Sequence, residues 1–279
     1  MIVAPRNSFT VFCRRKSKGD PAMINRARKD RAGSVNADVI EVFASVQGEG
    51  IYLGERQTFV RFAGCNLACL FCDTAAKETE RKCRIEKEAG SGAFEVRPNP
   101  LTHQELLSVV ERLTPVRGTV SLTGGEPLLH AEFLQDFIPM LKNCGYRVYL
   151  ETNGTLYDEL ALLVSQIDVI AMDIKLPSAT GEKDFFEEHA KFLEIAKSTD
   201  VFVKAIITAN TLEDEIQRCA EIIASVDSNI PLILQPVTPV KPEIYKPSPQ
   251  DLLRLQANCL KMVRNVRIIP QCHKMVGLL

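Results

Sequence analysis

The sequence predicts an α/β protein whose strands and helices alternate, most simply a full or partial (β/α) TIM-type barrel. Three observations support this fold class. Short apolar runs alternate with longer segments of helical period from about residue 102 onward. Gly- and Pro-containing segments separate these runs. The 46% hydrophobic content of the 279 residues suffices for one barrel-sized core, and the chain has no internal repeat.

The expected strands are short runs rich in β-branched, aromatic and other apolar residues. In chain order they cover 39–43, 58–62, 119–122, 147–150, 169–172, 201–207, 232–234 and 266–269. Strand–helix alternation over such a length indicates a parallel sheet.

The expected helices have recognisable start signals. Thr102 to Glu105 forms a capping-box pattern ahead of a segment with one apolar face. Thr211 is the expected N-cap of a helix over 212–225. Ser248 and Pro249 begin the last long helix, with proline at its first position. Further helices are expected over 132–143, 156–165 and 183–197.

Two segments differ from the alternating pattern. Residues 1–34 are rich in Arg and Lys and lack a sustained period, so we expect a disordered basic extension ahead of a single domain over 35–279. The alternatives are a tail that binds RNA or a partner, and translation that begins near Met23. Residues 75–100 are polar and interrupted by Gly and Pro, which predicts an insertion or lid with Cys83 as a surface thiol.

Bulk properties exclude several classes of partner. A net charge of −1 gives no reason to expect a nucleic acid or an acidic lipid surface. No apolar run approaches the roughly 18–20 residues that span a bilayer. The nine cysteines, three clustered and six scattered, do not resemble a disulfide framework. We therefore expect a soluble protein in a reducing, cytoplasmic compartment.

The clustered cysteines are Cys65, Cys69 and Cys72, directly after an expected strand. A structural iron–sulfur cluster or zinc site normally has four protein ligands. Three thiolates can instead hold three irons of a cubane and leave the fourth open to a ligand. The spacing fits zinc poorly, although Cys83 could complete such a site, and the cysteines could also be reduced core residues.

Polar and glycine-rich segments follow other expected strands directly. They are 123–127 (Thr-Gly-Gly-Glu-Pro), 151–154 (Glu-Thr-Asn-Gly), 173–175 (Asp-Ile-Lys) and 235–236 (Gln-Pro). Because the carboxyl ends of parallel barrel strands lie at one mouth, we expect these segments and the cysteine loop to converge there.

Each segment suits a polar ligand. The glycines Gly124 and Gly125 let the backbone approach it, and Glu126 can accept hydrogen bonds from an amino group. Asn153 suits a ribose and Lys175 a carboxylate. The structural alternatives are a type II turn at the glycine pair, an Asn-Gly turn at 153–154, and a solvated strand-end lysine.

The cysteine triad, with Phe71 before its last member, resembles the radical S-adenosylmethionine superfamily, and 124–127 resembles its Gly-Gly-Glu-Pro element. From about residue 38 to the end, the chain resembles the 7-carboxy-7-deazaguanine synthase family. The resemblance rests on the motifs at 41–50, 59–67, 72–74, 151–154 and 271–274 (Gln-Cys-His-Lys), of which Gln-Gly-Glu-Gly at 47–50 is the most specific.

This resemblance implies a partial barrel of the radical S-adenosylmethionine type and a lyase reaction in queuosine and 7-deazapurine biosynthesis. A reduced 4Fe–4S cluster cleaves S-adenosylmethionine, and the resulting radical takes a hydrogen from 6-carboxy-5,6,7,8-tetrahydropterin. The ring contracts with loss of ammonia to give 7-carboxy-7-deazaguanine. Mg²⁺ and an electron donor such as a flavodoxin or ferredoxin are also implied. A homodimer is compatible with the sequence.

The resemblance also implies roles for individual residues. The cluster ligands are Cys65, Cys69 and Cys72. The S-adenosylmethionine set comprises Phe71, Asp73, Gly125, Glu126, Asn153, Asp173, Ile174, Lys175 and Gln235. The pterin set comprises Val46, Gln47, Gly48, Arg61, Thr123 and Glu151, and Thr74 is the Mg²⁺ ligand. No acid–base residue is assigned.

One segment departs from the family pattern. Residues 173–175 replace the family's common Ser-Pro-Lys, and an Asp-x-Lys form also occurs in activating enzymes of glycyl-radical enzymes. Such an activating enzyme is one alternative function. A noncatalytic iron–sulfur protein is another, although it would have no reason to keep Arg61 and the Gly-Gly-Glu-Pro element.

Overall fold

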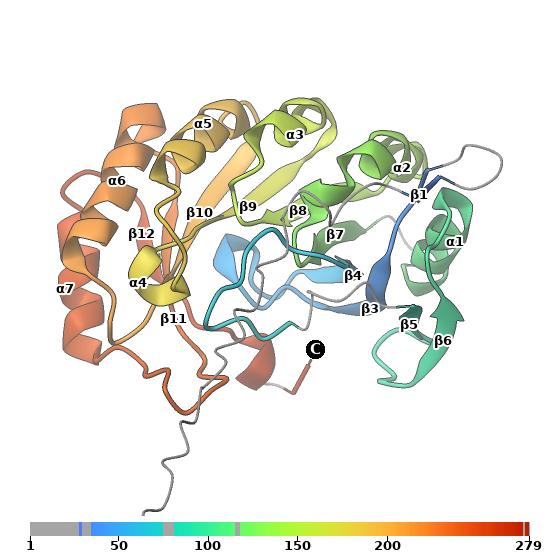
Figure 1. Ribbon diagram of the computed structural model, residues 1–279, viewed down its shortest axis with the longest axis horizontal. Helices are drawn as coiled ribbons and strands as arrows, with labels where there is room; N and C mark the ends of the chain where they lie inside the picture. Colours follow the sequence, from blue (N-terminus) through green and yellow to red (C-terminus); the bar gives the residue numbers. More distant parts are fainter. Residues whose placement is uncertain (1–27, 30–34, 75–80, 115–117, 276, 279) are drawn as a thin grey trace, which may run out of the picture.

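The computed structural model describes residues 28–29, 35–74, 81–114, 118–275 and 277–278, and its main feature is one curved, mixed sheet of ten strands (Figure 1). The strand order is β12-β11-β10-β9-β8-β7-β4-β3-β5-β6. From β4 to β12 every neighbouring pair is parallel, and β3 is antiparallel to β4. The predicted α/β class with a parallel sheet is confirmed.

The strands agree with the expected runs and extend most of them by one to three residues. Their bounds are β3 (Val39–Val46), β4 (Arg56–Phe62), β7 (Thr119–Gly124), β8 (Arg147–Thr152), β9 (Val169–Ile174), β10 (Asp200–Ile207), β11 (Leu232–Pro236) and β12 (Val266–Ile268). A separate two-stranded ladder joins β1 (Arg28–Lys29) to β2 (Val35–Asn36).

The helices follow the strands and lie along the outer side of the curved sheet (Figure 1). Their bounds are α1 (His103–Leu113), α2 (Ala131–Asn143), α3 (Tyr157–Ala161), α4 (Pro177–Thr180), α5 (Phe186–Ala196), α6 (Glu213–Asp227) and α7 (Pro249–Cys259). Short 3₁₀ turns are η2 (Gly50–Tyr52), η3 (Pro127–His130), η4 (Val164–Gln166) and η5 (His273–Met275).

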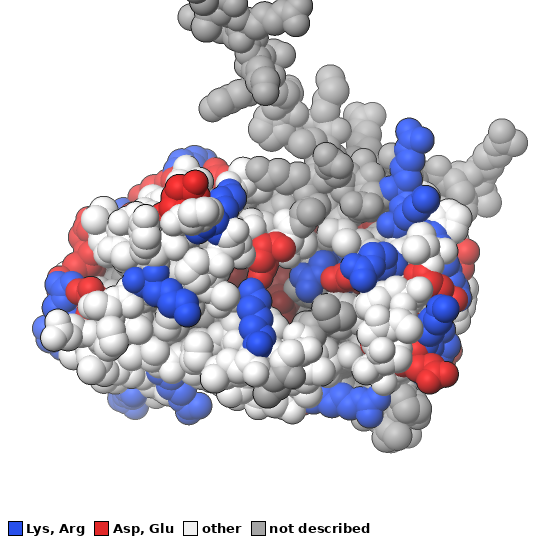
Figure 2. Space-filling view, turned by 90° about the horizontal axis from the view of Figure 1, so that it is seen from below, with Lys and Arg blue, Asp and Glu red and all other residues white. Residues whose placement is uncertain are grey.

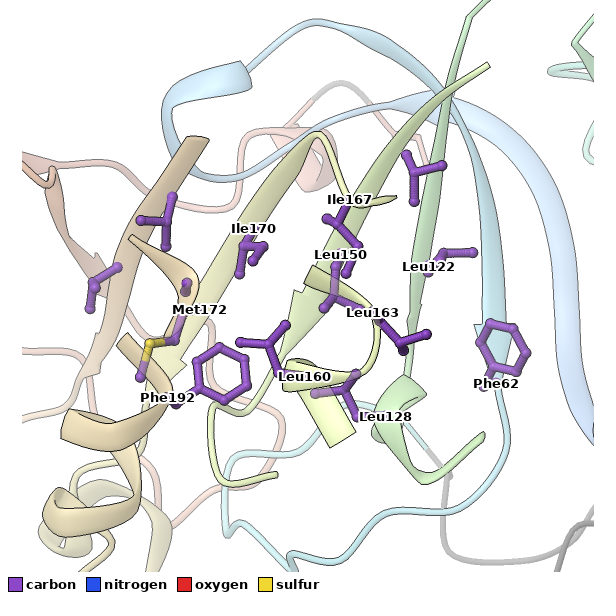
Figure 3. Close-up of a cluster of buried hydrophobic side chains, with 14 of the residues drawn as sticks. Phe62, Leu122, Leu128, Leu150, Leu160, Leu163, Ile167, Ile170, Met172 and Phe192 are labelled. Atoms are coloured by element: carbon purple, nitrogen blue, oxygen red, sulfur yellow. The ribbon is translucent and has the colours of Figure 1, made fainter. Parts of the chain in front are cut away.

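The two faces of the sheet carry different side chains because successive strand residues point to opposite sides. One face packs against the helices and forms the large hydrophobic core, which includes Leu122, Leu150, Ile170 and Phe192 (Figure 3). The inner face carries a small apolar cluster of Tyr149, Val169, Ala171, Phe202 and Ile233. Residues Ile51 and Tyr52 of η2 pack on this small cluster and cover one end of the inner face.

Helix boundaries give one confirmation and one correction. Thr102 forms the predicted capping box with Glu105. The predicted N-cap at Thr211 is wrong, because α6 begins at Glu213 with Leu212 in the N-cap position. The Thr211 hydroxyl instead accepts a 2.9 Å hydrogen bond from the Thr208 amide in the preceding turn. The helices expected over 156–165 and 183–197 are shorter, since α3 ends at residue 161 and α5 begins at residue 186.

The segment expected as an insertion contains a hairpin of β5 (Lys82–Glu86) and β6 (Phe94–Pro98). Strand β5 pairs with β3 and extends the main sheet. Cys83 and Ile85 face the core and are fully buried, so the prediction of a surface thiol at Cys83 is wrong. Residues 75–80 of this segment, and all of the expected basic extension except Arg28 and Lys29, lie outside the described residues. No helix in the described ranges is long and apolar enough to cross a membrane.

Candidate functional site

A cavity of about 230 Å³ opens on the inner face of the sheet. Its wall contains segments from the cysteine loop, the turn after β3, the ends of β7 to β11, and the region around η5. Figure 2 shows a face of the molecule that is hollowed near its centre, with acidic and basic side chains around the hollow. The predicted convergence of these distant segments is therefore present in the structure.

Strand alternation explains which side chains reach the cavity. Each of four strands carries an inner-face apolar residue and, two positions later, a polar one. These pairs are Tyr149 and Glu151, Ala171 and Asp173, Phe202 and Lys204, and Ile233 and Gln235. The inner face thus has an apolar floor, and a polar layer lies above it toward the carboxyl ends of the strands.

The three cysteines of the loop after β4 all line the cavity. They are free thiols, with Cys72 exposed and Cys65 and Cys69 half-buried. Burial raises the pKa of Cys65 to about 11, so metal binding is needed to favour its thiolate. Within the described ranges no three His, Cys, Asp or Glu side chains converge on a single metal ion. A cubane binds each thiolate to a different iron, so three open thiols on one short loop fit a cluster.

The glycine pair after β7 packs against the backbone at the end of the neighbouring strand β4. Gly124 has a φ of 134°, and a Cβ there would lie 2.3 Å from the Phe62 carbonyl oxygen. The Gly125 amide donates a 3.1 Å hydrogen bond to the same oxygen. The glycines therefore let the loop between β7 and η3 cross close to the end of β4, and both line the cavity.

Glu126 differs from its expected placement because it is fully buried and outside the cavity wall. Its carboxylate accepts hydrogen bonds from the amides of Leu128 at 3.1 Å and Asn153 at 2.8 Å, and from the Thr152 hydroxyl at 2.9 Å. Burial raises its pKa to about 7 despite these donors. In this structure Glu126 connects the loops after β7 and β8 by hydrogen bonds.

Ile174 also lies outside the cavity wall. Its position between Asp173 and Lys175 turns its side chain to the opposite face of β9, where it joins the large core. Its side chain therefore cannot meet a ligand in the cavity.

Asn153 lines the cavity and is tightly held. Its side-chain amide donates to Asn66 Oδ1 at 2.8 Å, and its own Oδ1 accepts from the Thr155 hydroxyl at 2.6 Å. Behind it, the buried His189 donates from Nε2 to the Asn153 carbonyl at 3.1 Å. These contacts fix the turn after β8 and connect it to the cysteine loop.

Asp173 and Lys175 lie beside the cysteine loop in the cavity wall. Lys175 Nζ donates to Asp173 Oδ2 at 2.8 Å and lies 5.6 Å from the centre of the Phe71 ring. Burial opposes the charged form of Lys175, but Asp173 and Cys69 together outweigh it and raise the lysine pKa. A fixed ammonium therefore lies beside the cysteine loop.

The other side of the cavity is a hydrogen-bonded set around Glu151. Gln47 Nε2 and the Thr123 hydroxyl each donate to this carboxylate at 2.8 Å. Nearby, Arg61 Nε pairs with Glu41 at 3.0 Å, and its Nη1 lies 3.4 Å from the Thr74 hydroxyl. Donors and acceptors for a polar ligand thus line the cavity together with the thiols.

Residues 271–274 close over the turn after β3. The Cys272 amide donates to the Gly48 carbonyl at 2.8 Å, and a Cβ on Gly48 would lie 1.9 Å from Nδ1 of His273. Lys274 Nζ binds Asp73 at 2.9 Å, which joins this segment to the cysteine loop as well. Gly48 is therefore required by a close approach of two segments far apart in sequence.

Sequence reasoning assigned no site role to several polar residues of the cavity wall, among them Glu49, Lys204, Gln271 and His273. Gln271 Nε2 donates to Glu49 Oε1 at 2.8 Å, and Lys204 binds the other oxygen of Glu49 at 2.5 Å. Burial opposes ionisation of Glu49, but Lys204 outweighs it and lowers the pKa to about 2. Lys204 could have been found from the alternation of side chains along its strand, because Lys204 points to the same face as Phe202 and Ile206.

The remaining predicted site residues lie in the cavity wall. They are Val46, Gln47, Gly48, Arg61, Phe71, Asp73, Thr74, Thr123 and Gln235.

The Radical SAM superfamily model matches residues 59–223. The chain is 43% identical over 245 residues to the 7-carboxy-7-deazaguanine synthase of Geobacter sulfurreducens, covering 86% of this chain and 97% of that one. It is 36% identical over 248 residues to the synthase of Methanopyrus kandleri, covering 86% and 93%. The fold resembles the crystal structure of QueE from Escherichia coli, with a TM-score of 0.55, 20% identity, and coverage of 85% and 95%. The chain therefore belongs to the 7-carboxy-7-deazaguanine synthase family of the radical SAM superfamily.

Proposed function

We propose that this chain is a 7-carboxy-7-deazaguanine synthase that converts 6-carboxy-5,6,7,8-tetrahydropterin to 7-carboxy-7-deazaguanine with loss of ammonia. The observation that carries the proposal is the two-sided cavity. Three open thiols and the Asp173–Lys175 pair lie on one side, and the Gln47–Glu151–Thr123 set lies on the other. One ligand can be held against another in such a cavity, as hydrogen transfer between them requires.

The residues on the thiol side suit S-adenosylmethionine and a 4Fe–4S cluster held by Cys65, Cys69 and Cys72. When bound, the cluster supplies the electron that cleaves S-adenosylmethionine. Lys175 offers an ammonium to the methionine carboxylate, and Asn153 offers an amide to the ribose. A low-potential donor such as a flavodoxin or ferredoxin reduces the cluster.

The residues on the opposite side orient the pterin. Glu151 accepts N–H donors of the ring, Gln47 both donates and accepts, and the Arg61 guanidinium pairs with the pterin carboxylate. The hydroxyl of Thr74, 3.4 Å from Arg61, offers an oxygen ligand to Mg²⁺ near the same carboxylate. The ring contraction then depends mainly on positioning, because the held groups fix which ring atom faces the thiol side.

The cavity supports a small substrate over the glycyl-radical-enzyme alternative. An activating enzyme must admit a loop of a large protein to its reactive centre. Here Gln271 and His273 line the cavity, and their segment binds both the turn at Gly48 and the loop at Asp73. A planar ring of pterin size suits a cavity of about 230 Å³ better than a protein loop.

The testing experiment is anaerobic turnover with reconstituted cluster, S-adenosylmethionine, reductant and Mg²⁺. We expect 7-carboxy-7-deazaguanine to form, as followed by chromatography and mass spectrometry. A protein that cleaves S-adenosylmethionine but leaves the pterin unchanged would contradict the proposal.

A matched variant tests the pterin side. We expect Arg61→Ala to weaken pterin binding by at least about tenfold, as expected for a lost charge-assisted pair, while the cluster spectrum stays intact. The exposed Arg218→Ala, in α6, serves as the control. Loss of the cluster in Arg61→Ala would refute the assigned role.

A further inference from the structure

Lys204 is a buried lysine to which the proposed reaction assigns no role. It lies in the middle of β10, and its side chain is only 6% exposed. Burying an ammonium costs several kcal/mol unless it is paired, so its partners decide what the residue does.

Two carboxylates from different parts of the chain bind this ammonium. Glu49, in the turn after β3, lies 2.5 Å from Nζ, and Asp173 lies 3.4 Å away. Asp173 is also the direct register partner of Lys204 on the neighbouring strand β9. Glu49 lies 155 positions earlier in the sequence, so no local geometry holds it there.

Glu49 and Asp173 each bind one further residue besides Lys204, so the set of polar contacts continues on both sides of the lysine. Glu49 accepts a 2.8 Å hydrogen bond from Gln271, and Asp173 accepts one of 2.8 Å from Lys175. Lys175 in turn lies over the Phe71 ring of the cysteine loop. A continuous polar chain therefore runs from residue 271 to the cysteine loop, with Lys204 at its centre.

We propose that Lys204 is a positioning residue whose positive charge balances Glu49 and Asp173, so that the Lys175 ammonium stays available to a ligand on the S-adenosylmethionine side of the cavity. The identity of this ligand rests on the proposed function. In the chain of contacts, two ammoniums face two carboxylates. Without Lys204, the two carboxylates of Glu49 and Asp173 have only the Lys175 ammonium to balance them. Their attraction for Lys175 then competes with the methionine carboxylate that this ammonium should bind.

The charge balance gives a test that separates positioning from general damage. Lys204→Met should weaken S-adenosylmethionine binding by at least about fivefold, the lower range of measured coupling between sites. Adding Glu49→Gln removes one negative charge and leaves Asp173 paired with Lys175. The double variant should therefore bind S-adenosylmethionine within about twofold of wild type, the range expected for independent sites. Lys204→Arg should stay close to wild type.

The measurements are dissociation constants from anaerobic equilibrium dialysis of labelled S-adenosylmethionine, with the thermal melting of cluster-free protein. The exposed Lys197→Met serves as the matched control. Unchanged S-adenosylmethionine binding in Lys204→Met would overturn the proposal. A double variant as weak as Lys204→Met would also overturn it, because a merely structural role predicts that result. These affinities do not depend on pterin turnover, so failure of the proposed function would show separately, in the wild-type turnover assay.

Discussion

The side-chain amide of Gln47 donates a 2.8 Å hydrogen bond to the Glu151 carboxylate, across 104 positions of sequence. Gln47 follows β3, the strand that runs against its neighbour β4, whereas Glu151 lies on the parallel strand β8. The contact therefore attaches the turn after β3 to the inner face of the parallel sheet. It also fixes the carboxylate that, in the proposed function, receives the pterin.

Glu151→Gln is expected to weaken pterin binding by about tenfold, the effect of losing one or two charge-assisted hydrogen bonds. The new glutamine side chain has one oxygen that accepts and one N–H₂ group that donates. Either Gln47 or Thr123 therefore loses its acceptor and faces the N–H₂ group instead. S-adenosylmethionine binding without pterin should change little. Dialysis with each ligand measures both effects, and the exposed Asp158→Asn is the control. Equal loss for the two ligands would contradict a specific role for Glu151.

Gly124→Ala is expected to lower the free energy of unfolding by more than about 1 kcal/mol, because the positive φ disfavours a side chain. A Cβ at this position would also meet the Phe62 carbonyl oxygen at 2.3 Å. Gly90→Ala is a matched control, since its φ is 75° but no atom lies within 4 Å of the added carbon. Thermal melting should separate the two variants. Equal melting temperatures would show that the contact with Phe62 relaxes without cost.

Thiol labelling of cluster-free protein should distinguish two classes among the described cysteines. Cys72 is exposed and should react first, whereas Cys83, Cys219 and Cys259 are buried and should react only on unfolding. Burial raises the pKa of Cys83 to about 12, which slows its reaction further. Iodoacetamide modification followed by peptide mass spectrometry measures the order. Early modification of Cys83 would contradict its place in the β5–β6 hairpin.

His189 should make stability depend on pH. Burial lowers its pKa from 6.5 to about 4, so the unfolded chain binds more protons between these values. Its contribution to the free energy of unfolding is complete above pH 6.5. This contribution falls by at most about 3 kcal/mol as the pH drops toward 4. His189→Gln should therefore flatten the urea-unfolding stability curve between pH 4 and 6.5. Above pH 7 the stability of wild type and of His189→Gln should change with pH in the same way. A variant whose stability falls more steeply than that of wild type below pH 6.5 would contradict the assignment.

Much of the fold could be predicted because its signals are local. Strand ends, turn glycines and the capping box at Thr102 follow from neighbouring residues, and parallel topology brings the strand ends together. The β5–β6 hairpin was missed because it lies at the sheet edge. In β5 the buried apolar residues Cys83 and Ile85 alternate with exposed Lys82 and Arg84, and the neighbouring Glu86 is buried but charged, so the segment is polar on average.

The missed part of the site depends on contacts between distant residues. Lys204 sits in an apolar strand and gains its partners only when Glu49 and Asp173 meet it. Glu126 has the expected sequence context, but its carboxylate turns toward the amides of Leu128 and Asn153. Sequence spacing places a residue near the mouth of the barrel without fixing which way its side chain points.

The hydrogen bond from Gln271 to Glu49 spans 222 positions, most of the chain. Closing a loop of such length costs more conformational entropy than forming a local contact. The turn at Glu49 is made early in the sequence but reaches its final shape only after the opposite edge of the sheet has been added. The shape of this turn therefore depends on both ends of the folded domain, and a truncation after β12 would remove one of them.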